Sequence, residues 1–318
     1  MKTKFLLSML LLQGLAALAA AGEYRRDLVV GGRTRTYYVH TPPQYNPTMA
    51  LPVVLGLHGG GGNAAIHRVQ SKMDFASNRF GYIAVYPEGT GPDASRLLTW
   101  NAGICCGYAS YYKIDDVGFI RALLDDLPHV VTFDKRRVYC TGMSNGAMMS
   151  YRLACELPDR IAAICAVSAS MGVDGPRPTR PVPIMEIHGL NDPNAPFDGG
   201  VGPNAMSKIE HKPVLDVMEW WRVVDQCSED TQYTEGNDGH VIHGDEDFQQ
   251  FGPVSWARVE WLPTKPNTGA PVILYALVEG GHTWPGGVDV TKDLGTGTLV
   301  SNFDANAVMW EFFRQFSL

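Results

Sequence analysis

The pentapeptide Gly-Met-Ser-Asn-Gly at residues 142–146 is the strongest constraint on the fold. It follows a strand-like run at 137–140 and precedes a helical pattern at 147–157. A sharp turn from strand to helix holds its central serine in a strained conformation, and the flanking glycines leave room where a Cβ would clash. The motif therefore predicts a nucleophilic hydroxyl, Ser144, at the end of a sheet strand.

Short apolar runs alternate with helical patterns along the chain. The strand-like runs cover 52–57, 82–86, 137–140, 161–167, 182–187 and 272–277, and the helical patterns cover 117–127, 147–157, 214–224 and 305–316. Nearly continuous apolar strands are typical of a parallel sheet covered on both faces. We therefore expect an α/β fold with a mostly parallel central sheet flanked by helices. Strand-like segments on either side of Gly31-Gly32 predict an N-terminal antiparallel hairpin, whereas the polar stretch 228–253 predicts irregular loops or a small hairpin.

The first 21 residues have the pattern of a secretory signal. Lys2 and Lys4 precede an apolar run at 5–20, and small residues at 19 and 21 suit cleavage before Gly22. We expect a secreted or periplasmic protein with no stable membrane association after cleavage. No linker, charge block or repeat divides the remaining residues, so 22–318 are predicted to form a single domain.

The charge balance points away from nucleic acid. The formal net charge is −7 and becomes −9 once Lys2 and Lys4 are removed, whereas nucleic-acid binding relies on dense positive charge. Neutral or weakly charged substrates fit better. The sequence sets no oligomeric state.

The base that activates Ser144 is predicted to be His282. A serine hydroxyl needs an imidazole to take its proton and a carboxylate to hold that imidazole. His282 lies in a Gly-Gly-His-Thr-Trp-Pro-Gly loop just after the last strong strand. His188 and His243 are the alternatives, and His188 is assigned a structural role in orienting the next loop.

The acid is predicted to be Asp192, in the segment His-Gly-Leu-Asn-Asp-Pro that follows the strand-like run 182–187. Asp198, six residues later in a glycine-containing loop, is the alternative.

A glycine run at 59–62, again at a strand end, predicts an oxyanion hole. Backbone N–H groups can approach a developing alkoxide there because no side chain intervenes. We assign Gly60 and Asn145 as the two donors. The run lacks the Gly-Lys-Ser/Thr ending of a phosphate-binding loop, and neither His188 with Asp192 nor His240 with His243 supplies enough converging ligands for zinc. We therefore predict no cofactor and no metal.

Together these motifs resemble the polyhydroxybutyrate depolymerase-like esterases, relatives of the feruloyl and acetylxylan esterases in carbohydrate esterase family one. The resemblance covers most of the mature chain and rests on segments at 35–39, 58–62, 86–89, 100–107, 115–119, 142–146, 188–192, 221–227 and 281–286. It implies an α/β-hydrolase fold and places nucleophile, acid and base on Ser144, Asp192 and His282.

The resemblance also implies details around the site. The 100–107 loop is expected to border it. Trp100 and Trp284 are expected to help wall the substrate pocket, although packing alone would equally explain both. Pairing of Cys105 or Cys106 with Cys140 is expected, because a bond between the two adjacent cysteines would be strained. Cys155 and Cys165, each in an apolar run, are expected to be buried thiols.

The expected function is hydrolysis of small or polymeric carboxylic esters through an acyl-enzyme. Feruloyl or acetyl esters of plant polysaccharide are the favoured substrates. Poly(3-hydroxybutyrate) is the alternative, since aromatic residues near the site suit either. An acyltransferase on the same fold would share these motifs and is a further alternative. The complete set of Ser144, Asp192, His282 and the glycine run argues against a binding protein with a vestigial site.

Overall fold

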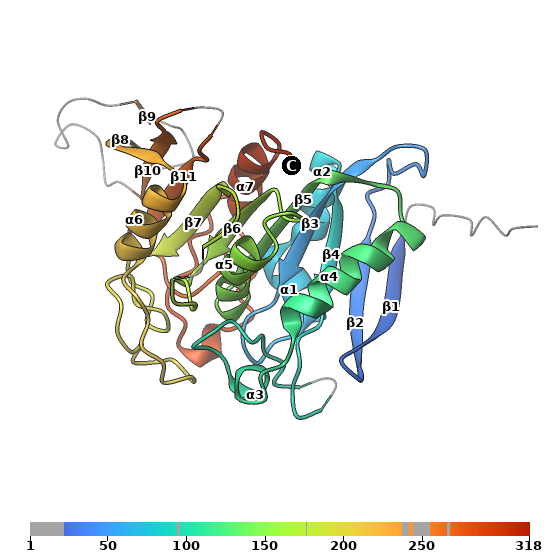
Figure 1. Cartoon of the computed structure of the whole chain (residues 1–318). Helices are drawn as coiled ribbons and strands as arrows, with labels where there is room; N and C mark the ends of the chain where they lie inside the picture. Colours follow the sequence, from blue (N-terminus) through green and yellow to red (C-terminus); the bar gives the residue numbers. More distant parts are fainter. Residues whose placement is uncertain (1–21, 94–95, 176, 237–241, 244–254, 266–267) are drawn as a thin grey trace, which may run out of the picture.

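A single mixed sheet runs through the protein in the order β1-β2-β4-β3-β5-β6-β7-β11-β10-β8-β9 (Figure 1). Its strands are β1 (Glu23–Val30), β2 (Arg33–His40), β3 (Leu51–Leu57), β4 (Ile83–Pro87), β5 (Phe133–Met143), β6 (Ala163–Val167), β7 (Ile184–Gly189), β8 (Cys227–Gly236), β9 (Ile242–His243), β10 (Trp256–Pro263) and β11 (Val272–Leu277). This computed structural model describes residues 22–93, 96–175, 177–236, 242–243, 255–265 and 268–318. The predicted signal segment and His240 lie outside them.

The central strands β4, β3, β5, β6, β7 and β11 are parallel, and both ends of the sheet are antiparallel. The predicted α/β class and the N-terminal hairpin are confirmed. At the other end, β8 lies in the stretch for which irregular loops or a small hairpin were predicted, and it pairs antiparallel with β9, whereas β10 was not predicted. Residues 229–233 of β8 are all exposed, so this strand lacks the alternation of buried and exposed residues and its sequence resembles a loop.

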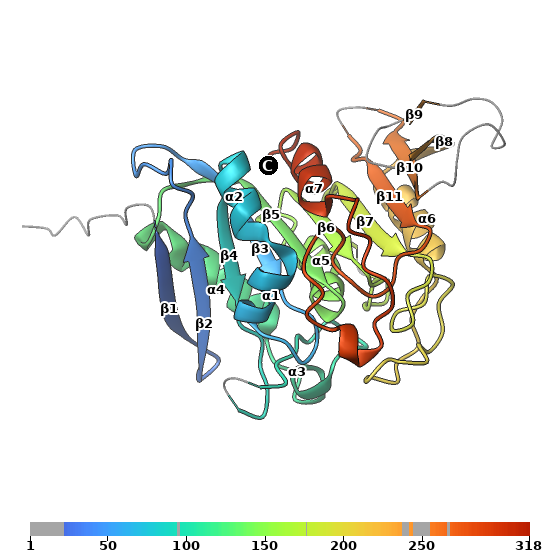
Figure 2. The ribbon, with the colours of Figure 1, turned by 180° about the vertical axis from the view of Figure 1, so that it is seen from behind.

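Helices cover both faces of the sheet. They are α1 (Ala64–Ser71), α2 (Met73–Phe80), α3 (Gly107–Tyr111), α4 (Asp116–Asp126), α5 (Asn145–Glu156), α6 (Val214–Val224) and α7 (Ala305–Phe313), with short 3-10 turns η1 (Leu127–His129) and η2 (Lys292–Leu294). In Figure 1, α4, α5 and α6 lie in front of the sheet, and Figure 2 shows α1, α2 and α7 on the other face. None of the helices among the described residues is both long and apolar enough to span a bilayer.

Two apolar cores follow from this layering. One joins the sheet to α4, α5 and α6 through residues such as Phe119, Met149 and Trp221. The other joins it to α2 and α7 through Met73, Trp310 and others. Alternate side chains of the buried strands point to opposite faces, which accounts for apolar residues at nearly every strand position.

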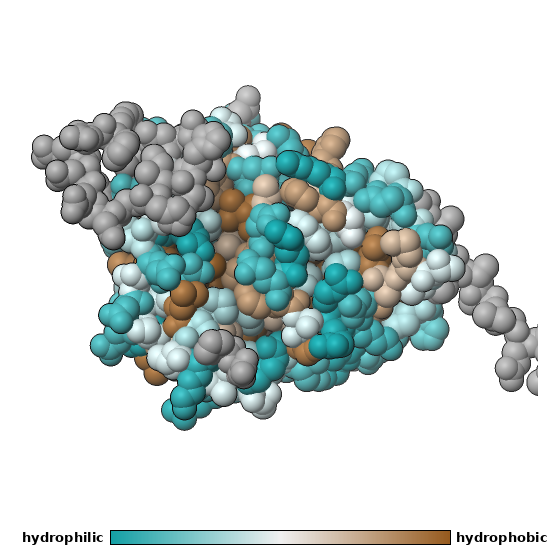
Figure 3. Space-filling view, turned by 90° about the horizontal axis from the view of Figure 1, so that it is seen from above, coloured by the Kyte–Doolittle hydropathy of each residue, from teal (hydrophilic) through white to brown (hydrophobic). Residues whose placement is uncertain are grey.

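The loops that matter for function follow the carboxyl ends of the parallel strands. Residues after β3, β5, β7 and β11 meet at one edge of the sheet, on the side where α3 lies in Figure 1. At the opposite end, the residues coloured in Figure 3 are mostly polar, with small apolar patches between them. The site therefore forms where an open α/β sheet ordinarily binds its ligand.

Candidate active site

Ser144 stands at the turn between β5 and α5 with φ 57° and ψ −123°. A non-glycine residue in this region is strained, and the surroundings hold it there: its N–H donates to the Val167 carbonyl at 2.9 Å. A Cβ on Gly146 would collide with the Leu57 carbonyl oxygen, and one on Gly142 would collide with the Gly146 backbone. The two glycines are therefore what lets α5 start directly under the nucleophile.

His282 and Asp192 are hydrogen-bonded, although they are ninety residues apart in the chain. His282 Nδ1 donates to Asp192 Oδ2 at 2.8 Å. Both side chains are buried, and His282 lines the same cavity as Ser144. Donation from Nδ1 leaves Nε2 as the nitrogen that can take a proton from a nucleophile.

The loop after β7 fixes Asp192. The other carboxylate oxygen, Oδ1, accepts the backbone N–H groups of Asn194 and Ala195, each at 2.8 Å. Burial by itself would raise the pKa of Asp192, but the charge and hydrogen bond of His282 lower it overall. Asp198, the alternative acid, is exposed. Of the two aspartates, the structure pairs Asp192 with the histidine.

The glycine run after β3 lies next to the β5–α5 turn that holds Ser144, which we call the elbow. A Cβ built on Gly59 would sit 3.5 Å from Ser144 Cβ, and one on Gly60 would sit 3.5 Å from Asn145 Cβ. Gly60 and Asn145, the predicted oxyanion donors, are thus adjacent, and both line the cavity.

His58 keeps the glycine run in place. Its Nδ1 donates to the Gly59 carbonyl at 2.8 Å, and its Nε2 accepts the Gly89 N–H at 3.0 Å. Burial lowers the pKa of His58 to about 4, so the ring is neutral at physiological pH, as these two bonds require.

A cavity of about 1050 Å³ opens above these residues. Aspartate, glutamate, lysine and arginine are all absent from its described lining. Its rim carries exposed apolar side chains, namely Ile66, Leu97, Tyr111, Tyr112, Met206 and Leu294. The cavity suits an uncharged ligand with apolar groups.

Residues 36–210 match the family model described as "Esterase PHB depolymerase". The chain belongs to this esterase family. The match covers more than half of the chain and includes the glycine run, the Ser144 elbow and Asp192.

Similar curated proteins are esterases too. The "Putative esterase NocK" of Nocardia uniformis subsp. tsuyamanensis is 30% identical over 85% of this chain and 76% of its own length. "Feruloyl esterase B" of Piromyces equi is 28% identical over 64% of this chain, but the match spans only 38% of that protein. "Probable feruloyl esterase C" of Aspergillus niger is 30% identical over 52% of this chain and 58% of its own length.

Among solved structures, the acetyl xylan esterase from Aspergillus awamori superposes with a TM-score of 0.54. It covers 86% of this chain and 98% of its own, at 15% identity. At that identity the likeness concerns the fold, which is that of an α/β-hydrolase.

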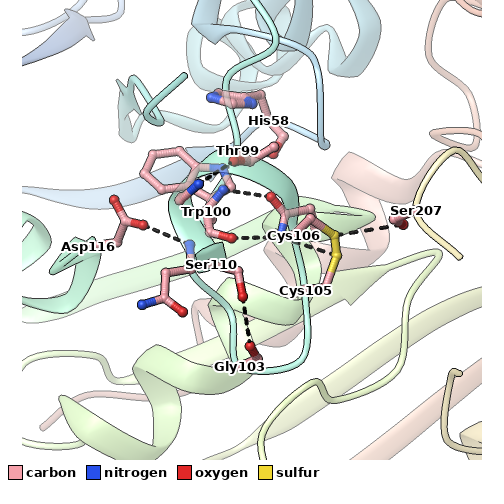
Figure 4. The surroundings of a disulfide bond; sticks show 12 residues. His58, Thr99, Trp100, Gly103, Cys105, Cys106, Ser110, Asp116 and Ser207 are labelled. Atoms are coloured by element: carbon pink, nitrogen blue, oxygen red, sulfur yellow. Dashed lines mark hydrogen bonds between the residues drawn. A yellow bond between two sulfur atoms is a disulfide. The ribbon is translucent and has the colours of Figure 1, made fainter. Parts of the chain in front are cut away.

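The disulfide of this esterase differs from the one expected. Cys105 and Cys106 are bonded to each other, as Figure 4 shows, and Cys140 is a free thiol. Cys140 lies inside β5, where its sulfur faces the Ser150 hydroxyl of α5 at 3.3 Å, whereas the bonded pair lines the cavity. The predicted pairing with Cys140 is therefore wrong, while Cys155 and Cys165 are free and buried as expected.

Trp100 supports the esterase site from behind and does not wall its pocket. It is fully buried and absent from the cavity lining. Its backbone exchanges two hydrogen bonds with the Asn145 side chain, at 2.7 and 3.0 Å, and its indole N–H donates to the His58 carbonyl at 2.9 Å. Trp100 thus ties together the two strand ends that carry the expected oxyanion donors.

Trp284 is likewise buried behind the cavity. Its ring lies edge-on to His67 with centroids 5.4 Å apart, and it does not line the cavity. The expectation that these two tryptophans form the pocket wall is corrected, because apolar motif residues near a site pack under its loops as readily as they face its ligand. The wall is made instead by residues around α3, including Tyr108 and Tyr112.

The potential metal ligands of the esterase either lie outside the cavity or already bond to other protein groups. Among the described residues, Glu23, His40 and Asp74 come close enough to share an ion, but Arg68 already bridges the two carboxylates and none of the three lines the cavity. Both ring nitrogens of His188 face protein oxygens. His240 lies outside the described residues.

Sequence reasoning missed Glu186 and Tyr151. Both are fully buried, and the Tyr151 hydroxyl donates to the Glu186 carboxylate behind Asp192. A lone glutamate inside the apolar run 182–187 was the available signal, because a buried acid needs partners.

Proposed function

We propose that the protein hydrolyses neutral carboxylic esters through an acyl-enzyme on Ser144. The observation that carries the proposal is the His282–Asp192 pair, held at the same cavity as a serine in a strained elbow. A buried carboxylate that orients an imidazole beside such a serine is the arrangement that makes a hydroxyl nucleophilic.

The reaction follows from these positions. Ser144 Oγ attacks the ester carbonyl while His282 Nε2 takes its proton. The negative oxygen of the tetrahedral intermediate accepts hydrogen bonds from the backbone N–H groups of Gly60 and Asn145. His282 returns the proton to the leaving alcohol, and an acyl group remains on Ser144. Water, activated by the same histidine, then releases the acid and restores the serine.

Feruloyl or acetyl esters of carbohydrate are the proposed substrates. Tyr108 and Tyr112 line the cavity with ring centroids 4.4 Å apart, and they offer an aromatic surface for a hydroxycinnamoyl ring. The uncharged lining agrees with neutral esters, and similar proteins carry the names feruloyl esterase and acetylxylan esterase. Export, proposed from the 1–21 segment, would bring the enzyme to such polymers.

A polyester such as poly(3-hydroxybutyrate) is the second candidate. The apolar rim favours it, because Met206 and Tyr111 are 76% and 80% exposed at the cavity mouth. A rim of this kind suits contact with an apolar polymer surface.

The test is hydrolysis of p-nitrophenyl acetate, methyl ferulate and short 3-hydroxybutyrate oligomers by the mature protein and by Ser144→Ala. We expect turnover of at least one ester and a fall in kcat of at least about 10⁴-fold in the variant. Ser77→Ala, which removes a buried serine of α2 outside the cavity, is the control and should keep full activity.

The ranking of the three esters decides between the two substrate classes. Analysis of products with an added alcohol separates hydrolysis from acyl transfer. Activity in Ser144→Ala equal to wild type, or no turnover of any ester, would contradict the proposal.

A further inference from the structure

Three buried side chains form a chain behind the acid of the site. Tyr151 of α5 donates its hydroxyl to Glu186 of β7. The other oxygen of Glu186 lies 2.8 Å from His188 Nδ1, two residues along the same strand. His188 Nε2 lies 2.8 Å from the Ala195 carbonyl and 3.7 Å from Asp192 Oδ2. The series ends beside the carboxylate that holds His282.

Both ring nitrogens of His188 face oxygen atoms, and this restricts its protonation. The Ala195 carbonyl can only accept, so Nε2 carries a hydrogen. Nδ1 faces a carboxyl group, so the proton between them belongs either to the imidazole or to Glu186. Burial raises the pKa of Glu186, but the Tyr151 hydroxyl stabilises the anionic form of that carboxyl group. The Asp192 carboxylate, 3.7 Å from Nε2, stabilises a charged ring. Both neighbours favour a proton on each nitrogen of His188.

We propose that His188 is a buried imidazolium, paired with Glu186, that positions Asp192 and keeps it ionised. This inference rests on the proposed serine esterase mechanism. His188 is a positioning residue, since it acts on the reaction through Asp192 and does not line the cavity. Its bond to the Ala195 carbonyl closes the loop whose N–H groups hold Asp192.

The surrounding groups supply few other charges. Cys165 of β6 lies near Tyr151 and Glu186, and burial raises the pKa of that thiol well above its ordinary value. Burial also lowers the pKa of His211 to about 4, which keeps that ring neutral. At neutral pH the carboxylates of Glu186 and Asp192 and the ring of His282 are therefore the groups that set the field at His188. Burial would lower the pKa of His188, but its bond to Glu186 and the two carboxylates raise it overall.

The charge on His188 has a consequence for the pH profile of the enzyme. A positive ring 3.7 Å from Asp192 weakens the hold of that carboxylate on a protonated His282. In Glu186→Gln the partner charge is lost, so His188 becomes neutral while its Nε2–H can still hold the Ala195 carbonyl. Asp192 then favours protonated His282 more strongly. The acidic limb of kcat/KM should move to higher pH by about half a unit to one unit.

The direct test is ring-nitrogen NMR of the mature protein labelled with ¹⁵N-histidine, with His188→Gln used to assign the signals. We expect both nitrogens of His188 to be protonated at pH 8, well above the ordinary histidine pKa of about 6.5. An unprotonated Nδ1 would overturn the proposal. This readout needs no turnover, so it stands apart from any failure of the esterase assignment.

The kinetic test compares pH profiles of wild type, Glu186→Gln and a control. Tyr82→Phe serves as the control, because Tyr82 is a fully buried tyrosine whose hydroxyl bonds to the Met73 carbonyl outside this network. Its acidic limb should coincide with that of wild type. A Glu186→Gln limb that also coincides would refute a role for the charge.

If Glu186→Gln does not fold, Tyr151→Phe replaces it. That variant removes the donor to Glu186 and should shift the limb in the same direction by a smaller amount. An unshifted limb in folded Tyr151→Phe would count against the proposal equally.

Discussion

Asp192 accepts three hydrogen bonds, one from His282 and two from backbone N–H groups. Such a carboxylate sets both the orientation and the tautomer of the imidazole, because only a protonated Nδ1 can donate a hydrogen bond to it. A carboxamide in place of this carboxylate would offer a competing donor and permit the wrong tautomer.

We expect Asp192→Asn to lower kcat by about 10⁴-fold with little change in KM, because geometry survives while the base is misdirected. Asp198→Asn, at the exposed neighbouring aspartate, should leave both constants within about twofold. Steady-state kinetics on p-nitrophenyl acetate measures both. Equal losses in the two variants would argue against the assignment of the acid.

At the residue scale, the sequence predicts which residues lie at the ends of strands. Ser144, Asp192 and His282 each follow a strand-like run, and the parallel topology brings such positions to one edge. The catalytic roles given to them remain predictions. The sequence does not predict the direction in which the side chain of a motif residue points. The prediction that Trp100 and Trp284 form the pocket wall was therefore wrong. The predicted cysteine pairing was wrong because the positions of cysteines in the sequence do not reveal which sulfur atoms lie close together in the fold.

At the scale of elements, a buried ion pair joins the N-terminal hairpin to the loop beside the cavity. Arg35 of β2 donates to Asp116 of α4 at 2.7 Å, and its guanidinium lies 4.0 Å over the Phe119 ring. The other oxygen of Asp116 accepts the Asn101 N–H at 2.8 Å. The hairpin is thus coupled to the 100–107 loop through one carboxylate.

Arg35→Met should destabilise the protein by about 3–5 kcal/mol, because it leaves a buried carboxylate uncompensated. Arg25→Met is the matched control on β1, since its pair with Asp27 is exposed and should matter by less than about 1 kcal/mol. Urea unfolding monitored by tryptophan fluorescence compares them. A double variant, Arg35→Met with Asp116→Leu, should recover part of the loss; no recovery would mean that the charge is not the cause.

Elements were predictable where burial imposes a pattern. The long helices α4, α5 and α6 were found within two residues of their observed bounds, since each shows an apolar stripe. The eight-residue helices α1 and α2 were not found. Each is little longer than two turns, and exposed apolar residues such as Val69 and Phe75 blur the stripe.

At the scale of the whole molecule, buried neutral histidines make stability depend on pH. His67 is fully buried, and neither ring nitrogen has a hydrogen-bond partner among the described residues. Burial lowers the pKa of His67 to about 3, whereas an unfolded histidine titrates near 6.5. Between these values the unfolded chain binds one more proton at this site, so stability falls as pH decreases.

Replacing His67 with phenylalanine should therefore flatten the pH dependence of the unfolding free energy. Between pH 5 and 6 the slope should decrease by about 1 kcal/mol per pH unit, whatever the packing cost of the substitution. Urea unfolding at several pH values gives the slope. Parallel curves for wild type and His67→Phe would show that this ring is already protonated when folded.

The disulfide between Cys105 and Cys106 makes one stretch of the cavity wall a product of oxidation as well as of folding. A chain freshly made in a reducing cytoplasm would carry two thiols at that place, and only an oxidising destination would join them. The final form of this cavity wall would then depend on the compartment in which the protein resides. The same polypeptide would present one wall to an ester in a reducing compartment and a different wall in an oxidising one.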